Sequence, residues 1–279
     1  MATIANLRAD VRSRMVESSA DFFSDAEIDR WVNQGYKAFV ARTDWTEKVK
    51  AYTMVANQFE YTLPSDIKRI DLVMWEDQYK VEWADLEEFR EYVGTSDGTS
   101  SDRPVVYRTY PWDGKMRVYP IPSAASASST VSGAHNDTVG TIAVASGTSF
   151  PTRGRAIINS SEQILYYNKS GNNLLQCTRG DGYTTAASYA GGETIVHAPL
   201  EVYMVYQPPD IATGVDSRIG PSYDEALICY ACHVARLKKG KFDEAKAYRQ
   251  LFDTLVDKAV EERAKQQRDR LHVIKLDGE

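Results

Sequence analysis

Residues 22–39 read FFSDAEIDRWVNQGYKAF, and this stretch decides how the fold begins. Ser24 followed three residues later by Glu27 forms a capping box, in which each side chain can satisfy a free backbone N–H at a helix start. Apolar residues then recur at helical spacing and form one face. The stretch therefore predicts an amphipathic helix from Ser24 to about Arg42, a pattern that many globular proteins also contain.

The elements around this helix follow in a fixed order. Residues 3–17 carry a shorter helix with its own apolar stripe, and residues 49–61 and 67–75 alternate in the manner of strands. Residues 84–93 predict another short helix. Pro104 to Pro122 predicts a hairpin, because Asp113-Gly114 tolerates the positive φ values of a tight turn.

The order of these elements, with FFSDAEIDRWVNQGYKAF, then EYTLPSDI at 60–67 and DGKMRVYPIPS at 113–123, resembles tailed-phage head–tail adaptor proteins. These proteins are also called connector or head-completion proteins. The resemblance covers about 1–122 and 199–279. It implies a ring, commonly of twelve subunits, that lies below the portal protein, extends the DNA channel and docks the tail or nozzle.

The sequence departs from that pattern after the hairpin. Residues 123–133 (SAASASSTVSG) predict a flexible linker by composition. Short β-like runs separated by Gly, Asn and Ser clusters follow, and the family's last strand comes only with PLEVYMVYQPP at 199–209. The stretches at 148–167 and 178–195 resemble a small β-module of phage tail and virion proteins. We therefore expect an inserted β domain.

The last third of the chain is predicted to be helical. Ser222 and Glu225 have the spacing of a second capping box, and Gly240 ends the helix that would follow. A second helix starts near Phe242. Its apolar stripe gives way to charge in 260–270, and residues 271–276 form an apolar tail with strand character.

Cys229-Tyr-Ala-Cys232-His233 matches the haem c attachment motif. It lies within a helical stripe, where cysteine behaves as a small buried hydrophobe, so we interpret it as structural. A zinc site would need two further ligands, and the remaining histidines lack the spacing to supply them. We expect no cofactor and no metal.

Arg179-Gly180-Asp181 spells a cell-adhesion tripeptide, which we interpret as a tight turn within the β-module. Motifs for nucleophilic catalysis, phosphate binding and metalloprotease chemistry are missing from the sequence. Four scattered histidines do not assemble a nucleophile with a base. We therefore expect no enzymatic activity.

The predicted fold class is α+β. A host domain at 1–122 and 199–279 combines N-terminal helices, a small antiparallel sheet, a C-terminal helix pair and a tail. The linker occupies 123–133, and an all-β domain is inserted at 134–198. The expected ring contacts lie on the helices, with Trp31, Phe39, Tyr248 and Phe252 as their residues. The expected portal-binding tail comprises Leu271, Val273, Ile274 and Leu276.

The expected partners are copies of the same chain in a ring of about twelve, as the resemblance implies, the portal protein, and a tail or nozzle protein. Fibres are a further candidate for the insert. The net charge of −6 argues against a dedicated nucleic-acid binder and suits DNA that slides through without specific binding.

The sequence predicts a virion protein made in the host cytoplasm and located in the neck between the capsid portal and the tail. It has no apolar run near the roughly 18 residues of a membrane span, and no secretory signal is expected. The alternative function is a tail or host-recognition protein that uses the β insert to bind a receptor or carbohydrate. That alternative predicts a trimer with exposed aromatic side chains on the insert.

Overall fold

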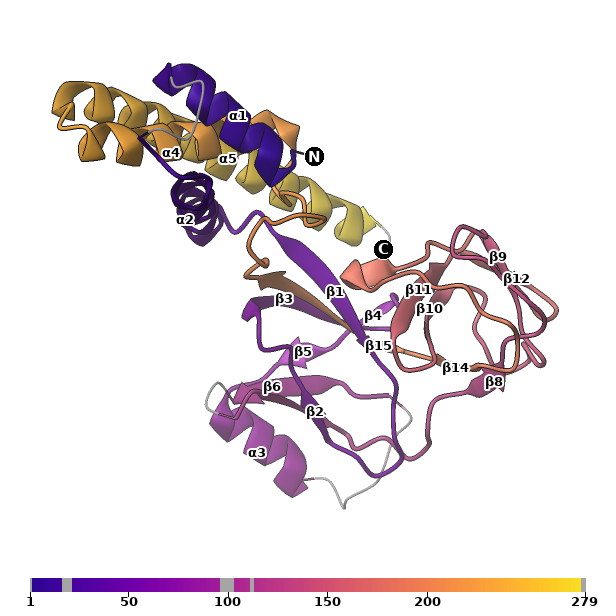
Figure 1. Cartoon of the computed structure of the whole chain (residues 1–279). Coiled ribbons are helices and arrows are strands. Elements are labelled where there is room, and N and C mark those ends of the chain that lie inside the picture. Colours follow the sequence, from indigo (N-terminus) through magenta and orange to yellow (C-terminus); the bar gives the residue numbers. More distant parts are fainter. Residues whose placement is uncertain (1, 17–21, 96–102, 111–112, 277–279) are drawn as a thin grey trace. The chain divides into compact units, whose positions relative to one another are not determined.

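The chain has an α+β fold, as the sequence predicts (Figure 1). The computed structural model describes residues 2–16, 22–95, 103–110 and 113–276, with the side chains of the last turns of the final helix, from residue 267 onward, left out. The contacts divide the chain into two compact units. Met1–Glu47 and Tyr206–Glu279 form a helical unit, and Lys48–Val205 form a strand unit.

The helical unit contains α1 (Ile4–Met15), α2 (Asp25–Thr43), α4 (Asp224–Lys238) and α5 (Phe242–Leu276). The predicted capping box at the start of α2 is confirmed. Ser24 Oγ accepts from Glu27 N at 3.3 Å, and Glu27 Oε2 accepts from Ser24 N at 3.1 Å. None of the helices among the described residues is long and apolar enough to cross a membrane.

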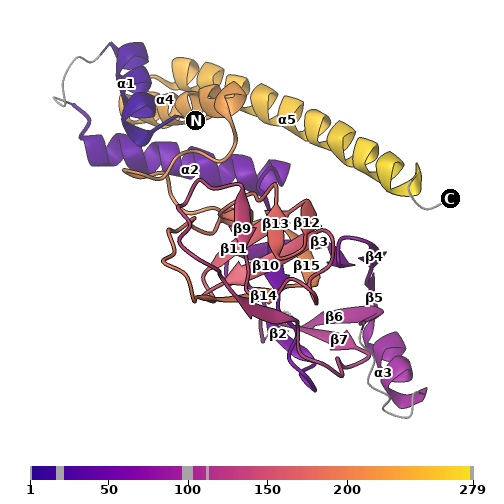
Figure 2. The same ribbon diagram turned by 90° about the vertical axis from the view of Figure 1, so that its right-hand side faces the viewer.

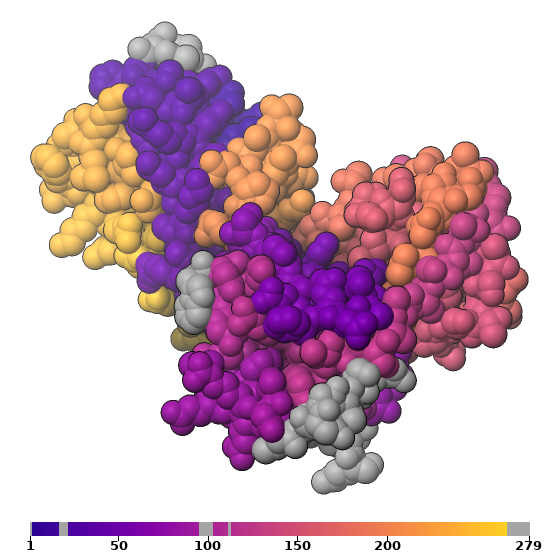
Figure 3. All heavy atoms as spheres, turned by 90° about the horizontal axis from the view of Figure 1, so that it is seen from below, coloured from indigo at the N-terminus to yellow at the C-terminus, as the bar shows by residue number. Residues whose placement is uncertain are grey.

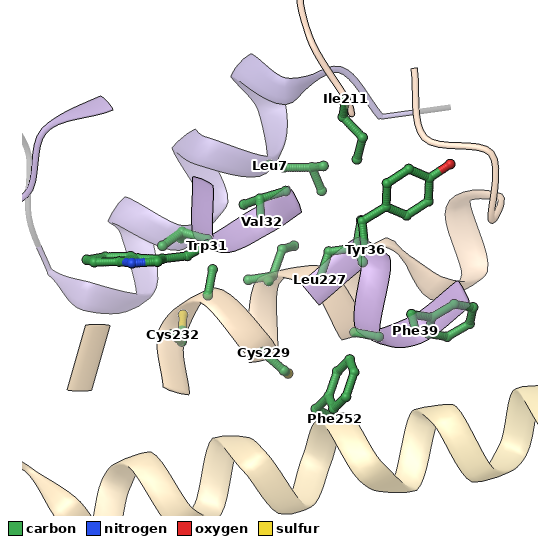
Figure 4. Close-up of a cluster of buried hydrophobic side chains, with 14 of the residues drawn as sticks. Leu7, Trp31, Val32, Tyr36, Phe39, Ile211, Leu227, Cys229, Cys232 and Phe252 are labelled. Atoms are coloured by element: carbon green, nitrogen blue, oxygen red, sulfur yellow. The ribbon is translucent and has the colours of Figure 1, made fainter. Parts of the chain in front are cut away.

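One apolar core holds these four helices together, and its side chains come from both ends of the chain (Figure 4). Leu7 of α1, Val32 of α2 and Leu227 of α4 converge there, and Phe252 reaches the same core from α5. Gly35 allows α2 and α4 to approach closely, because a Cβ at this position would lie 2.8 Å from Tyr230 Cβ. The stripes predicted from sequence are thus the faces that pack.

The second predicted capping box is wrong. Ser222 lies inside a short 3₁₀ helix, η2 (Pro221–Tyr223), and α4 begins only at Asp224. Its N-cap residue is Tyr223, which makes no side-chain cap hydrogen bond. Pro221 fixes the φ angle of the first 3₁₀ residue, so the tighter turn takes the place that the sequence pattern gave to the cap.

The predicted strand character of the C-terminal tail is also wrong. Helix α5 is continuous from Phe242 to Leu276. It runs back along α4 and extends well past the first residue of α4 (Figure 2). The charged segment before the tail, EERAKQQRDR at 261–270, consists mostly of strong helix formers. A helix already formed by packing extends through such residues at little cost, so the tail continues it.

In the strand unit, one sheet has the order β1 (Glu47–Tyr52), β15 (Leu200–Tyr206), β3 (Ile67–Trp75) and β4 (Tyr79–Lys80). A second sheet has the order β2 (Glu60–Thr62), β7 (Lys115–Tyr119), β6 (Val106–Tyr110) and β5 (Glu82–Trp83). The predicted hairpin is confirmed, with β6 and β7 antiparallel. Helix α3 (Leu86–Thr95) packs Phe89 beside this second sheet.

Residues 128–197 form two further antiparallel sheets. One has the order β11 (Glu162–Tyr166), β10 (Gly154–Ile158), β14 (Thr194–His197) and β8 (Ser128–Thr130). The other has the order β12 (Asn168–Ser170), β13 (Asn173–Leu175) and β9 (Thr141–Ala143). Strand β8 lies within the segment expected as a linker and pairs with β14. These sheets share a core of their own around Ile158, Ile164 and Leu174.

Candidate interaction surfaces

The four residues predicted as ring contacts lie in the core of the helical unit. Trp31, Phe39 and Phe252 are buried there, and Tyr248 is half-buried against the same cluster. These side chains pack helices of their own chain against one another, as Figure 4 shows for the first three. Their role in contacts between subunits stays a prediction.

The predicted portal-binding tail occupies the last turns of α5. Leu271, Val273, Ile274 and Leu276 have helical backbones, and their side chains lie outside the described residues. The tail would therefore present a helix to a partner, and not the extended segment that the sequence suggested. Its binding to the portal stays a prediction.

The cysteine motif lies inside α4 and faces the helical core. Cys229 and Cys232 are fully buried (Figure 4), and burial raises the pKa of their thiols to about 12 and about 11. His233 Nδ1 lies 2.8 Å from the carbonyl oxygen of Ala245. Both thiols are therefore protonated at neutral pH and act as packing side chains. Within the described part of the chain, no group of three or more His, Cys, Asp or Glu residues could hold a metal ion.

The Arg179-Gly180-Asp181 tripeptide is a turn, as predicted, with Gly180 at a φ of 64°. The Arg179 guanidinium forms an ion pair of 2.6 Å with Glu162, and both side chains are buried. Glu162 also accepts hydrogen bonds from Tyr189 Oη at 2.8 Å and Ala187 N at 3.0 Å. The arginine of the tripeptide is thus buried in an ion pair and is not available on the surface for binding to a receptor.

Arg155 forms the centre of a buried ionic cluster that we call the polar junction, together with Asp181, Glu201 and Tyr203. Arg155 Nε lies 2.7 Å from Asp181 Oδ2, and its Nη1 donates to Glu201. Tyr203 Oη donates to Glu201 Oε2 at 3.1 Å. Because Glu201 lies in β15 while Arg155 lies in β10, the junction ties residues 134–198 to the sheet that contains β1, β15, β3 and β4.

Gln163 makes the second tie between the same two regions. Its Oε1 accepts from Ala51 N at 2.8 Å, and its Nε2 donates to Val49 O at 3.2 Å and Asp181 Oδ2 at 2.7 Å. One amide side chain of β11 thus satisfies backbone groups of β1. On the face seen in Figure 3, the atoms near residues 50–60 adjoin those of the β segment.

The charges at the junction affect one another strongly. Burial raises the pKa of Glu201 to about 7 against the opposing influence of Arg155. Burial alone would lower the pKa of Arg155, but Glu201 and Asp181 raise it above its usual value. His197 lies at the end of β14, and burial lowers its pKa to about 4. The histidine is therefore neutral in the folded protein at physiological pH.

Sequence reasoning missed the polar junction. Arg155, Asp181 and Glu201 lie on β10, the 3₁₀ helix η1 (Asp181–Tyr183) and β15, which are well separated in the chain, so no local spacing connects them. One signal was available: Glu201 is a lone carboxylate within the apolar run PLEVYMVY. A charge inside a strand buried on both faces requires a partner.

The helical unit exposes large apolar side chains where its helices turn. Val16 follows α1, Phe22 precedes α2, Leu237 lies in the last turn of α4, and Phe242 begins α5. Their exposed fractions are 89%, 56%, 41% and 70%, respectively. Exposed apolar clusters of this kind mark sites of protein–protein contact.

The described residues also line two shallow hollows. One of about 320 Å³ in the helical unit is lined by Trp45, Arg218, Tyr223 and Glu262, among others. The other, of about 340 Å³ in the strand unit, is lined by Lys48, Lys50, Thr62 and Thr184, among others. Lys48 is neutralised by Asp66 at 2.6 Å.

Comparison with known families gives one match. The family model described as SU10 adaptor protein matches residues 2–274, which is nearly the whole chain. A search of curated proteins found no match. The family match spans the helical unit, the host strands and the β segment together.

Proposed function

The chain belongs to the SU10 adaptor protein family, a family of phage structural adaptors, and on that premise we propose that it forms the ring that joins the portal to the tail or nozzle. The family match carries this proposal. The ring, of about twelve copies in the head–tail adaptors that the chain resembles, extends the DNA channel in the virion neck. Its acidic subunits, each with a net charge of −6, repel the phosphates of passing DNA.

The exposed apolar side chains of the helical unit support a self-assembling protein. A heterologous contact, in which two different patches of one chain meet, closes into a ring when the rotation between copies closes. Phe22 and Phe242 lie at helix ends, and more than half of the surface of each side chain is exposed. Burial in a contact between copies removes such side chains from water at a gain of roughly 25 cal/mol per Å².

Native mass spectrometry of the purified protein, alone and with its portal protein, tests the proposal. We expect one closed oligomer in at least one of the two samples. A strictly monomeric chain in both would contradict the ring. A trimer would favour the receptor-binding alternative instead.

We propose that the end of α5 docks into the portal as a helix. Four apolar residues, Leu271, Val273, Ile274 and Leu276, follow the charged segment 261–270, a composition that suits a segment buried only against a partner. Truncation after Arg270 should abolish portal binding and leave solubility and melting unchanged. Normal portal binding by the truncated chain would refute docking.

We propose that residues 134–198 are an inserted module, because, among the residues that the structure describes, the two sheets of this region pair no strand with the other two sheets. A second candidate function rests on this region. Tyr167 and Tyr183 are exposed on it, and exposed aromatic rings are common in carbohydrate and receptor sites. A glycan array with the wild type and with Tyr167→Ala tests this function. Binding that the substitution removes would support recognition; a blank array leaves the adaptor role as the proposal.

A further inference from the structure

The inference concerns the end of the helical unit at which α1 stops, α2 starts and α4 turns into α5 (Figure 1). We call this the turn end and define it by Phe22, Leu237, Lys239 and Phe242. Contacts hold its parts together. Arg236 Nη2 donates to the carbonyl oxygen of Arg14 at 3.2 Å, and Lys239 Nζ lies 5.1 Å from the centroid of the Phe22 ring.

The turn end carries a positive charge beside its apolar side chains. Lys238 is paired with Glu27 at 2.5 Å, and Lys241 with Glu244 at 3.1 Å. Lys239 has no carboxylate partner among the described residues and lies over the rings of Phe22 and Phe23. An exposed aromatic ring below an unneutralised ammonium favours a partner that offers both a carboxylate and an apolar side chain.

Helix α3 of the strand unit has that chemistry. Glu87 and Glu88 are exposed in its first turn, and Tyr92 and Val93 are 40% and 48% exposed in its last turns. Glu88 and Tyr92 are four residues apart and share one face of the helix. The segment 85–91 holds four carboxylates against one arginine. We call this face the α3 surface.

We propose that the α3 surface of one copy docks onto the turn end of the next copy. The two patches are different and complementary in charge, so the contact is heterologous and repeats around a closed ring. The apolar residues on both sides are buried by it, and Lys239 gains a carboxylate partner in Glu88. This inference rests on the proposed ring and names the surfaces that form it.

The first arm of the test removes apolar surface. Phe242→Ser should weaken self-association roughly tenfold or more, because the phenyl side chain of Phe242 is removed from water when the contact forms. Leu251→Ser is the matched control, since Leu251 lies on the same helix, away from the turn end, and is 53% exposed. Sedimentation velocity gives the association constant, and circular dichroism verifies that both variants fold. Equal association by the two variants would overturn the assignment of the turn end.

The second arm reverses the charges. Lys239→Glu and Glu88→Lys should each weaken assembly, and the double variant should restore it to within a few-fold of wild type, because each copy then carries both reversals. Lys246→Glu, at an exposed position of α5, controls for net charge. A double variant as weak as the sum of the single changes would show that α3 is not the occupant.

The two arms also separate this inference from the proposed function. A wild-type ring that survives every substitution overturns the inference and leaves the adaptor ring standing. A wild-type chain that is monomeric alone and with the portal overturns both. Where the wild type assembles only with its portal, the variants are measured with the portal present.

Discussion

The helical core and the polar junction each hold together segments that are distant in the chain. The helical core does so with apolar side chains, and the polar junction with charged and hydrogen-bonding ones. In the helical unit, Phe39, Leu227 and Phe252 bring helices from both ends of the chain together through apolar contact. In the strand unit, Arg155, Gln163 and Glu201 bring the β segment to the host sheet through charge and hydrogen bonds. The first contact is non-directional, whereas the second requires specific atoms at specific distances.

This difference predicts how each region responds to change. An apolar core accepts another apolar side chain of similar volume at small cost. A buried ion pair that loses one partner leaves a desolvated charge behind. A substitution in the polar junction should therefore lower the free energy of unfolding more than one in the helical core. The stability of the junction should also depend more strongly on pH.

Arg155→Met should have the largest effect, a loss of about 3–5 kcal/mol in the free energy of unfolding, because Glu201 stays buried without its cation. Urea unfolding of the variant and the wild type at pH 8 measures it. At pH 5 the loss should shrink, since Glu201 can then take up a proton. The double variant Arg155→Met/Glu201→Leu should recover most of the loss; no recovery would mean that packing, not charge, holds the junction.

His197 should make the strand unit sensitive to acid. Burial lowers its folded pKa to about 4 from an unfolded value near 6.5, so the unfolded chain binds the proton first. Stability from this group is present above pH 6.5 and is lost as pH falls towards 4, by up to about 3 kcal/mol. Unfolding from pH 7 to 4 should show a shallower decline for His197→Gln. Equal slopes for variant and wild type would exclude the histidine as the cause.

Phe252→Leu should cost about 1.5 kcal/mol or less, although Phe252 is fully buried, because the apolar core can repack around a similar volume. Thermal melting followed by helical circular dichroism measures the change. Leu251→Ala on the exposed side of the same helix serves as the reference and should stay within about 0.5 kcal/mol. A loss as large as that of Arg155→Met would remove the contrast between the two regions.

Cys232→Ala should have the smallest effect of the core substitutions, about 1 kcal/mol, since it removes one buried sulfur atom from α4. The absorption spectrum and metal content of the native protein should match those of the variant. Stoichiometric zinc or a haem absorption band in the wild type would show that the motif binds a ligand.

Local patterns predicted the parts of the fold that local forces build. The cap at Ser24, the stripes of the helices and the Asp113-Gly114 hairpin each depend on residues within a few positions of one another. The short β-like runs within 134–198 likewise predicted that this region is built of short strands. These features form in the same way wherever the segment lies in the protein.

The errors arose where a local pattern had two physical outcomes. Ser222 could cap a helix or sit in a 3₁₀ turn, and Pro221 decided for the turn. The tail at 271–276 could be extended by itself, but it follows a formed helix and continues that helix. The polar junction could not be predicted for another reason, because its members come from distant parts of the chain and meet only in the folded strand unit.

The chain enters and leaves the strand unit at neighbouring points. Thr46 and Tyr206 are joined by two hydrogen bonds, from Tyr206 N to Thr46 O at 3.1 Å and from Thr46 Oγ1 to Tyr206 O at 2.5 Å, and β1 and β15 then run on as adjacent strands. The 158 residues from Lys48 to Val205 therefore begin and end together. A short loop could close the helical unit in their place. The segment between these two points could therefore change in length without altering the path of the helices on either side of it.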